Sequence, residues 1–362
     1  MTNFQQNTPI HKILINEQVL ESALTKRIIN KLPKAEQIVF QDEKLKEIVK
    51  KHDESTTLLL TKLKGQPIIM CPGTTKHHCC NYRILNIGHS CTFNCTYCIL
   101  QDYLKTKALS VFTDIPEYMQ KNIIEKNIDA GSLYRIGTGE FTDSLIIDDI
   151  TELSTDLINF FRDYPNIILE FKTKSTNIES LLKTKPAKNI IVAWSVNSEK
   201  ISNTTESESP SLDERLQAAK KITDHGYDVA FHFDPMILYT DYWKDYQLTI
   251  QKIYTTIPKE KIRWISLGTL RFTKGLKPTF LKRSPLFIDE FILSDDQKFR
   301  YLRFRREQAY KKMLTEIKKH RPKQFVYLCM ESAVIWKNVF GFNFKDNEDF
   351  ELWFNKEVFT HL

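Results

Sequence analysis

The sequence lacks any apolar run as long as the roughly 20 residues that a membrane-spanning helix requires. Its first residues, MTNFQQNTPIHKIL, hold no basic segment followed by an apolar one, so no secretory signal is visible. Internal repeats, low-complexity tracts and an obvious linker are also missing. These absences lead us to expect a protein of the cytoplasm with no membrane partner. A chain of 362 residues is long enough for one large domain with additions, or for two domains.

Apolar residues make up 41% of the sequence and charged residues 27%, an ordinary mixture for a globular protein that buries a core. The seven cysteines are crowded, because six of them fall between Cys71 and Cys98, and their number is odd. Without an export signal, this crowding favours metal binding or redox chemistry over a disulfide framework. The cysteines are Cys71, Cys79, Cys80, Cys91, Cys95, Cys98 and Cys329.

The net charge of +7 is concentrated in one segment. Between Lys298 and Lys323 there are eleven basic residues and only two acidic ones, with aromatic residues interleaved. A local excess of positive charge suits a polyanion such as nucleic acid, and aromatic rings stack on unpaired bases. The alternative is a solvated helix face whose aromatic residues belong to the core. On the nucleic-acid interpretation, we expect phosphate contacts from Arg303, Arg305 and Arg306.

From Tyr82 onward, short apolar or β-branched runs alternate with helix-like segments. Repeated strand–helix units predict a parallel sheet, either open or curled into a barrel. Six units are two short of a complete (β/α)8 barrel, so the predicted fold is α/β, a partial (β/α)6 TIM-type barrel. The predicted strands are 82–87, 133–137, 167–172, 190–196, 228–234 and 264–269, and the predicted helices include 148–161, 178–182 and 212–223.

The segments outside the barrel complete the predicted organisation. The first part of the chain is polar and helix-prone, with apolar spacing at 12–20 and 45–49. We therefore expect residues 1–80 to form an N-terminal helical layer. The barrel is expected to span residues 81–275, and residues 276–362 are expected to form a basic C-terminal extension packed on it.

The most informative motif follows the first predicted strand. Cys91-Thr-Phe-Asn-Cys95-Thr-Tyr-Cys98 places three thiolates within eight residues, and thiolates are soft ligands that suit zinc or iron–sulfur clusters. Three thiolates on a cubane cluster would leave one iron open for a substrate or cofactor. A structural zinc site needs a fourth protein ligand instead. The candidates for that ligand are Cys71, Cys79, Cys80, His77, His78 and His89.

The CxxxCxxC spacing, with an aromatic residue at Tyr97, resembles the radical S-adenosylmethionine superfamily. The resemblance implies a [4Fe–4S] cluster on Cys91, Cys95 and Cys98, with S-adenosylmethionine at its open iron and Tyr97 packed nearby. The GTGE turn that ends at Glu140 resembles the superfamily turn whose glutamate receives the methionine amino group. Glycine lets a backbone approach a ligand closely and a carboxylate accepts from an ammonium. A plain strand-to-helix turn would explain the same residues.

More specifically, the chain resembles the spore photoproduct lyase family from about Leu58 to the RFTK segment that begins at Arg271. The FKTK segment after the third strand matches one whose lysine contacts the cofactor's carboxylate, which implies this role for Lys174. The WSVN segment after the fourth strand matches one with a cofactor-contacting serine, here Ser195. Without the resemblance, Lys174 would be a surface lysine and Ser195 a helix-capping serine.

The resemblance also implies a reaction. Enzymes of this family reverse a DNA lesion that joins two adjacent thymines, using a 5′-deoxyadenosyl radical made from the cofactor. An external electron donor of the flavodoxin or ferredoxin type is implied as a partner. The expected function is therefore that of a DNA-repair lyase, with Arg271 and Lys274, just beyond the sixth strand, contacting flanking phosphates.

The match is incomplete at the hydrogen donor. In the family the donor cysteine follows the second strand, where this chain reads GTGEFTDS and has no cysteine. Two substitutes are open, namely Cys329, which has Tyr327 near it, and the pair Cys79–Cys80. Buried cysteines are common and usually inert. We expect Cys329 to be the donor, with Tyr327 and Tyr97 taking part in the hydrogen-transfer relay.

Two other functions stay open at this point. A related radical enzyme would act on RNA or a small metabolite and consume the cofactor stoichiometrically. A non-catalytic nucleic-acid-binding protein would use its cysteines for structural zinc.

Overall fold

The computed structural model describes residues 10–52, 54–73, 76–104, 106–119, 132–206, 208–276 and 290–360. The chain divides into two compact units that are interleaved along the sequence. Unit 1 is Met1–Ile69, Arg83–Thr92 and Tyr103–Ile190, and unit 2 is Met70–Tyr82, Phe93–Asp102 and Ile191–Leu362. The expected three-part division at residues 80 and 275 stays a prediction. Among the described residues, no helix combines the length and apolar character needed to span a bilayer.

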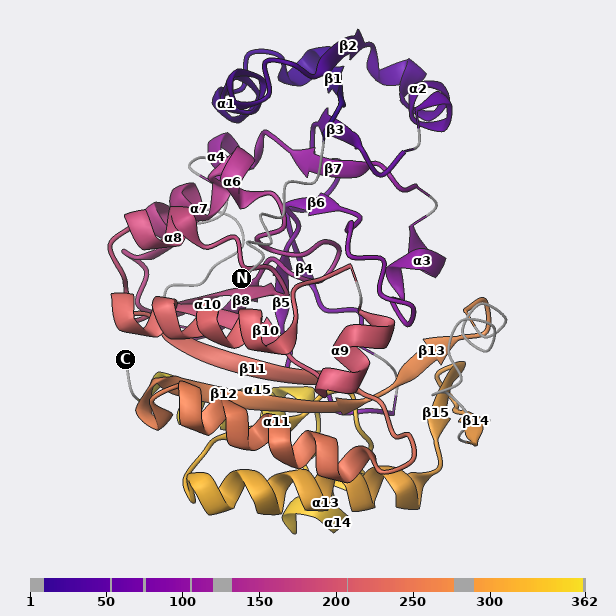
Figure 1. The fold of residues 1–362 in the computed structure, drawn as a ribbon, viewed down its shortest axis with the longest axis vertical. Helices are drawn as coiled ribbons and strands as arrows, with labels where there is room; N and C mark the ends of the chain where they lie inside the picture. Colours follow the sequence, from indigo (N-terminus) through magenta and orange to yellow (C-terminus); the bar gives the residue numbers. More distant parts are fainter. Residues whose placement is uncertain are drawn as a thin grey trace. The chain divides into compact units, whose positions relative to one another are not determined.

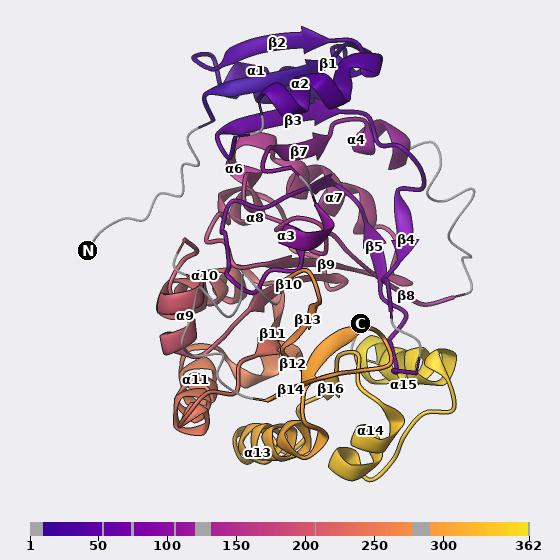
Figure 2. The ribbon, with the colours of Figure 1, turned by 90° about the vertical axis from the view of Figure 1, so that its right-hand side faces the viewer.

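Unit 1 begins with a five-stranded sheet in the order β2-β1-β3-β7-β6 (Figure 1, Figure 2). The first four of these strands are parallel, and the short β6 pairs antiparallel with β7. Apolar runs such as KILIN and TLLLT suit strands that are covered on both faces. The elements are β1 (Lys12–Asn16), α1 (Ala23–Lys31), β2 (Glu36–Phe40), α2 (Leu45–Lys51), β3 (Thr57–Thr61), β6 (Gly88–His89), β7 (Leu109–Phe112) and α4 (Ile115–Tyr118).

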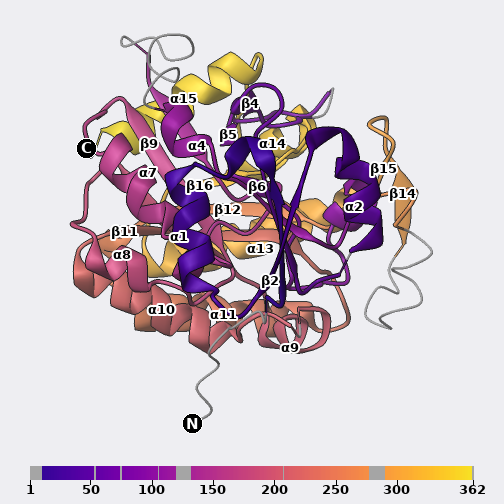
Figure 3. The same ribbon diagram turned by 90° about the horizontal axis from the view of Figure 1, so that it is seen from above.

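Helices α1 and α2 cover opposite faces of this sheet (Figure 3). On the α2 face, Leu14, Phe40 and Leu59 form a core against which Ile48 and Val49 of α2 pack. The predicted N-terminal helical layer is therefore wrong in part. Residues 45–49 are helical as expected, whereas the apolar spacing at 12–20 belongs to β1 and a short 3-10 helix. A short apolar run fits either a strand or a helix, so periodicity alone could not separate the two.

The six strands predicted for the barrel are confirmed. In unit 1, β5, β8 and β9 are parallel neighbours in that order. In unit 2, β10, β11, β12 and β16 are parallel neighbours in that order. β16 is a seventh strand, outside the six predicted ones. The bounds of the seven are β5 (Arg83–Leu85), β8 (Tyr134–Gly137), β9 (Ile167–Thr173), β10 (Ile190–Ser195), β11 (Asp228–Met236), β12 (Ile262–Thr269) and β16 (Val326–Leu328).

The helices between these strands match the predicted ones, with one break. The helix predicted at 148–161 is divided at Glu152, whose left-handed φ of 48° interrupts the helical backbone hydrogen bonding. Helix α10 begins with a capping box between Ser211 and Glu214, the arrangement that satisfies two orphan backbone donors. The helices are α6 (Asp148–Thr151), α7 (Leu153–Phe161), α8 (Glu179–Lys183), α9 (Glu199–Thr205), α10 (Leu212–His225) and α11 (Tyr242–Thr256).

The last part of unit 2 adds a small antiparallel sheet and three helices. Strand β15 lies between β13 and β14, and α13 runs beside α11 (Figure 1). The side chains of Trp336, Phe344, Phe350 and Trp353 pack together as an aromatic cluster. The elements are β13 (Arg271–Thr273), β14 (Phe291–Leu293), β15 (Lys298–Tyr301), α13 (Arg303–His320), α14 (Ala333–Phe340) and α15 (Asn347–Phe359).

The short strand β4 (Ile68–Met70) is hydrogen-bonded next to β5 at the edge of its sheet. The remaining short elements are α3 (Leu100–Tyr103) and the 3-10 helices at Glu17–Val19, Asp42–Lys44 and Lys259–Lys261.

Candidate active site

The three predicted cluster ligands lie in one loop, between β6 and α3. Ser90 and Asn94 adopt left-handed φ values of 72° and 47°, which turn the chain sharply on both sides of Cys91. Cys95 is buried, while Cys91 and Cys98 are partly exposed. The Cys98 N–H donates to the Cys95 carbonyl at 3.0 Å, so the turn between these two ligands is fixed by the backbone.

None of the seven cysteines, all of which the structure describes, forms a disulfide. In the described part of the chain, there is no group of three or more His, Cys, Asp or Glu side chains that could hold a metal ion. This absence covers the predicted iron–sulfur ligands and the candidate zinc ligands alike.

Tyr97 ties the cysteine loop to α9 of the same unit. Its buried hydroxyl donates to the Glu206 carboxylate, and the neighbouring Thr96 N–H donates to the Thr205 carbonyl at 2.9 Å. Burial, and next the Glu206 charge, raise the pKa of Tyr97 well above its ordinary value, so the phenol keeps its proton at neutral pH. The hydroxyl therefore anchors the loop, and the expected cofactor contact of Tyr97 stays a prediction.

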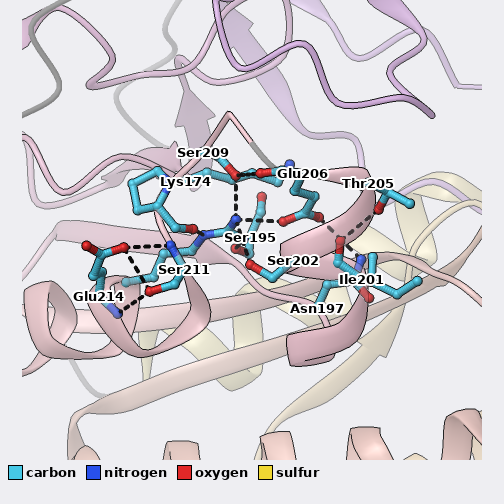
Figure 4. Close-up of polar contacts among 12 residues, drawn as sticks. Lys174, Ser195, Asn197, Ile201, Ser202, Thr205, Glu206, Ser209, Ser211 and Glu214 are labelled. Carbon is cyan, nitrogen blue, oxygen red and sulfur yellow. Dashed lines mark hydrogen bonds and ion pairs between the residues drawn. The ribbon is translucent and has the colours of Figure 1, made fainter. Parts of the chain in front are cut away.

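Figure 4 shows the buried network to which Glu206 belongs. The Arg215 guanidinium pairs with Glu206 at 2.7 Å and donates to the Ser195 carbonyl at 3.1 Å. The Ser209 hydroxyl accepts another of its hydrogen bonds, at 2.6 Å. Both charged groups are at most 1% exposed, a burial that is tolerated only with such pairing. Through Arg215, Glu206 and Tyr97, the end of β10, where Ser195 lies, is connected to the cysteine loop.

Sequence reasoning missed the roles of Glu206 and Arg215. Arg215 lies in the segment Ser211–Arg215, which resembles a family turn, but neither its burial nor its partner could be read from that pattern. The available signal was an arginine within the first turns of α10, beside otherwise apolar positions that face the core.

The GTGE turn follows β8 in unit 1 and packs tightly on β9. A Cβ atom at Gly139 would lie 2.4 Å from the Lys172 carbonyl oxygen, so only glycine fits this position. Glu140 comes next, and its carboxylate is 3.8 Å from Lys172 Nζ, with both side chains partly exposed. A loosely paired, partly exposed carboxylate is able to accept hydrogen bonds from a further cation.

Asp143 fixes the backbone at Lys174, which lies one residue beyond β9. The Asp143 carboxylate accepts from the Lys174 N–H at 2.7 Å and from the Thr173 hydroxyl at 2.6 Å. Burial raises the pKa of Asp143, and these two hydrogen bonds oppose the shift. Because β8 and β9 are parallel neighbours, Glu140 and Lys174 both follow carboxyl ends of adjacent strands. Asp143 is the residue of this group that the sequence reasoning missed.

Cys329, the predicted hydrogen donor, follows β16. Its N–H donates to the Leu267 carbonyl at 2.8 Å, and its sulfur is 3.5 Å from Arg271 Nη2. Burial, and next the Asp234 carboxylate, raise the pKa of Cys329 well above its ordinary value, while Arg271 acts in the opposite direction. The thiol therefore keeps its hydrogen at neutral pH, which is the form that a hydrogen-atom donor needs.

Arg271 is held by Asp234 through two hydrogen bonds of 2.9 and 3.1 Å. This bidentate pair, with both side chains largely buried, gives no support to the expected phosphate contact of Arg271. Lys274, by contrast, lies on the surface, where its Nζ donates to Gln297 at 3.0 Å.

The basic segment contains both buried and exposed arginines. Arg306 is buried and pairs with the Glu331 carboxylate, so the prediction that it contacts phosphate is wrong. A buried charge requires a charged partner of this kind. A run of basic residues in the sequence does not show which of them is buried or what its partner is. Arg303 is 64% exposed and lies 3.6 Å from Glu307, and Arg305 is partly exposed. These two positions stay predicted phosphate contacts.

Two of the four aromatic residues between Lys298 and Lys323 belong to the core. Tyr301 and Tyr310 are fully buried, and their hydroxyls accept from the Leu238 and Thr269 N–H groups at 2.9 and 2.8 Å. Phe304 is 62% exposed. Tyr327, the expected relay residue beside Cys329, is buried with its ring against Phe350 and Phe354. Its part in a relay stays a prediction.

Comparison with known proteins identifies one family. The model of the spore photoproduct lyase family matches residues 72–334. The spore photoproduct lyase of Bacillus subtilis (strain 168) is 24% identical over 214 residues, which cover 58% of this chain and 62% of that protein. The lyase of Geobacillus sp. (strain Y412MC61) is 28% identical over 207 residues, with 55% and 59% covered. The chain therefore spans about three fifths of the length of these curated relatives.

Solved structures show the same fold. A spore photoproduct lyase complexed with dinucleoside spore photoproduct superposes with a TM-score of 0.75 at 20% identity, covering 88% of this chain and 99% of that one. A variant of the lyase with bound AdoMet and the same dinucleoside gives a TM-score of 0.74 at 20% identity, covering 88% and 98%. The predicted α/β partial barrel is thereby confirmed. Since the family model also matches well over half of the sequence, the chain belongs to the spore photoproduct lyase family.

Proposed function

We propose that this chain is a radical lyase that reverses a thymine–thymine photoproduct in DNA, with a [4Fe–4S] cluster and S-adenosylmethionine as cofactors. The observation that carries the proposal is the family match over residues 72–334, within which every motif residue falls. It includes the three cysteines of the loop after β6, the last residue of β10, and residues that follow β8, β9 and β16. These are Cys91, Cys95, Cys98, Glu140, Lys174, Ser195 and Cys329.

The residues present suit the two cofactors chemically. Three thiols within one loop are soft donors of the kind that hold iron–sulfur clusters. Glu140 has a partly exposed carboxylate for an ammonium group, and Lys174 carries a cation for a carboxylate. Ser195 ends β10, and Arg215 holds its carbonyl. When bound, the cluster and S-adenosylmethionine supply a 5′-deoxyadenosyl radical to the site.

The protein's own part in the reaction is to hold the reactants and to return a hydrogen atom. We assign the return to Cys329, whose thiol is protonated and partly exposed. A thiol transfers a hydrogen atom to a carbon radical with its S–H bond as the only bond broken, so no base is needed. Tyr97 and Tyr327 are the proposed relay residues.

The proposed substrate is DNA, held in part by exposed cations of unit 2. Arg303, Arg305 and Lys274 are the candidates for phosphate contacts, which position a duplex without reading its sequence. A lesion inside a duplex has to leave the base stack before side chains reach it. A small electron-transfer protein of the flavodoxin or ferredoxin type is the proposed reductant, and the cytoplasm the proposed compartment.

The test is activity on a synthetic dinucleoside photoproduct after anaerobic cluster reconstitution. We expect about four irons per chain and reversal to the two unlinked thymidines, with 5′-deoxyadenosine well below one equivalent per turnover. The Cys95→Ala variant should bind less iron and show no reversal. Accumulation of 5′-deoxyadenosine without reversal would favour a different substrate. A colourless protein that binds zinc alone would refute the radical mechanism.

The donor assignment has its own test in the Cys329→Ala variant. We expect this variant to cleave S-adenosylmethionine as the unmodified chain does, but to convert the lesion into side products because the thymine radical receives no hydrogen. Product analysis by liquid chromatography and mass spectrometry measures this partition, with Cys71→Ala as the control. Clean reversal by Cys329→Ala would remove Cys329 from the mechanism.

A further inference from the structure

The Cys329 thiol lies against an ion pair of unit 2 to which the proposed mechanism gives no role. Arg271, the first residue of β13, donates an Nη2 hydrogen to the Cys329 sulfur at 3.5 Å. The same guanidinium is held by Asp234, near the end of β11, through hydrogen bonds of 2.9 and 3.1 Å. Cys329 is fixed from the other side of its backbone, because its N–H donates to the Leu267 carbonyl at 2.8 Å. The three side chains therefore form one series of contacts that ends at the sulfur.

A glycine in β12 makes room for the pair. A Cβ atom at Gly268 would lie 2.5 Å from Asp234 Oδ1 and 3.1 Å from Arg271 Nη1, so the two charged groups lie directly over the glycine backbone. The Asp234 and Arg271 side chains are only 11% and 15% exposed. A largely buried, bidentate pair of this kind is held in one geometry. The position of the guanidinium relative to the sulfur is fixed with it.

The charges near the sulfur oppose one another. A lone arginine in contact with a thiol stabilises the thiolate and lowers the pKa of the thiol. After burial, the Asp234 carboxylate is the largest cause of the raised pKa of Cys329, and it outweighs the opposite effect of Arg271. The thiols of Cys80 and Cys79 act in the same direction as Asp234, with smaller effects.

Other ionisable groups border this site. Arg300 lies opposite Arg271 in the register of β13 and β15, and it pairs with Asp296 at 2.6 Å. The pKa of Lys298 is lowered by burial and next by the Arg271 charge. Since Arg300 has its own counterion, Asp234 serves Arg271. The groups beyond the pair are Glu331, Arg306 and Tyr310, in which Arg306 and Tyr310 both donate to Glu331.

We propose that Asp234 and Arg271 are positioning residues for the hydrogen donor, in which Arg271 orients the Cys329 sulfur and Asp234 balances the charge so that the thiol keeps its hydrogen. The inference rests on the proposed function, in which Cys329 returns a hydrogen atom to the substrate radical. Because the sulfur accepts the Arg271 N–H, its own S–H points away from the guanidinium. Arg271 thereby receives a different task from the phosphate contact that the sequence predicted.

Alkylation of the full chain under nitrogen tests the charge balance without turnover. Iodoacetamide reacts with thiolates, and the tryptic peptide 324–337 reports Cys329 by mass spectrometry. In Asp234→Asn the cation loses its counterion, so we expect the pKa of Cys329 to fall by about 1–3 pH units. Its alkylation at neutral pH should be at least about threefold faster, since more thiolate is offset in part by lower nucleophilicity. The control is Asp228→Asn, which removes a carboxylate paired with Arg263 at the other end of β11 and should leave the rate unchanged.

Two further variants keep the test decisive if Asp234→Asn does not fold. Asp234→Asn/Arg271→Gln removes both charges, which a buried site tolerates better than one unpaired charge, and should alkylate no faster than the unmodified chain. Arg271→Gln alone should alkylate more slowly, because the group that favours the thiolate is gone. The inference is overturned by equal rates in Asp234→Asn and the unmodified chain, by a double variant as fast as Asp234→Asn, or by an Arg271→Gln that is not slowed.

Product analysis with the dinucleoside photoproduct tests the positioning in the reaction. A thiolate has no hydrogen to give, so Asp234→Asn should divert a growing share of the lesion into side products as the pH rises from about 6.5 to 8.5. The unmodified chain should keep a constant partition. A merely structural defect would slow turnover without making the partition depend on pH, and that result in Asp234→Asn would refute the proposal. If the unmodified chain reverses no lesion, the proposed function fails, while the alkylation rates still decide whether the pair controls the thiol.

Discussion

Asp148 is a buried carboxylate at the start of α6, and its ionisation is costly. It accepts hydrogen bonds from the Ser154 N–H at 2.9 Å and from the Ser154 hydroxyl at 2.5 Å. Burial nevertheless raises its pKa from 3.8 to about 6, because two neutral donors do not replace the water that the charge has lost. The folded chain therefore binds a proton here more tightly than the unfolded chain does.

This shift predicts a pH dependence of stability with a definite sign. Well below pH 3.8 the carboxyl is protonated in both states, so it has no effect. As the pH rises from about 4 to 6, the unfolded chain loses its proton first, and the free energy of unfolding falls by about 3 kcal/mol. Above pH 6 the free energy of unfolding falls no further on account of this group. Urea unfolding should show this fall in the unmodified chain relative to Asp148→Asn, which has no ionisable group at this position.

The control for this comparison is Asp163→Asn, at an exposed aspartate that follows α7. It should track the unmodified chain at every pH. If the difference in the free energy of unfolding between Asp148→Asn and the unmodified chain stayed the same from pH 4 to 7, the raised pKa of Asp148 would be contradicted.

Gly139 offers a second prediction for a single residue. In Gly139→Ala the added methyl group would meet the Lys172 carbonyl at 2.4 Å and Lys172 Cβ at 2.8 Å, so the turn has to move away from β9. We expect a loss of about 1–3 kcal/mol in the free energy of unfolding and weaker binding of S-adenosylmethionine, since Glu140 moves with the turn. Gly73→Ala, where the nearest atom is the Cys79 Cβ at 3.3 Å, is the comparison and should lose less stability than Gly139→Ala. Equal stability of Gly139→Ala and the unmodified chain would contradict this reading.

Among the secondary-structure elements, α13 combines a structural and a surface role within its first turn. Arg306 is paired inside unit 2, whereas Arg303 and Arg305 are at least partly exposed. The Arg303→Gln and Arg305→Gln variants should keep the stability of the fold but weaken binding to duplex DNA. Each is expected to reduce the slope of log Kd against log salt concentration by about 1. Fluorescence anisotropy over a salt series measures this slope.

The matched variant in the same helix is Arg306→Gln. It leaves the buried Glu331 carboxylate without its charged partner, and we expect a loss of about 3–5 kcal/mol in stability together with an unchanged salt slope. If Arg306→Gln reduced the slope and Arg303→Gln did not, the assignment of buried and exposed roles in α13 would be reversed.

The elements that the sequence predicted best are those with both an apolar run and a motif at its end. β8, β9 and β10 were placed to within a residue or two; Glu140 and Lys174 follow β8 and β9, and Ser195 is the last residue of β10. The N-terminal sheet was missed because KILIN is too short for its period to decide between strand and helix. Glu206 was missed for another reason. Its partner Tyr97 is 109 residues away, and the spacing of residues within a motif carries no information about such a contact.

For the whole molecule, the interleaving of the two units determines which fragments can fold. All segments of unit 1 lie within residues 1–190, whereas unit 2 needs Met70–Tyr82 and Phe93–Asp102 in addition to Ile191–Leu362. A fragment of residues 191–362 lacks Tyr97 for Glu206 and His78 for Glu331. We expect it to show no cooperative urea transition by circular dichroism, while a fragment of residues 1–190 shows one. A cooperative transition in the 191–362 fragment would show that the two inserted segments are dispensable.

The hydrogen bond from Cys79 to Asn347 spans 268 residues of sequence. On the ribosome, Cys71, Cys79 and Cys80 are therefore made long before the residues that cover them, and they emerge together with Cys91, Cys95 and Cys98. During that interval the nascent chain presents six thiols of similar character to any passing iron or zinc ion. The hydrogen bond that holds the Cys79 segment forms only after Asn347 has been made, so for the proposed cluster on Cys91, Cys95 and Cys98 we expect loading after the finished polypeptide has been released.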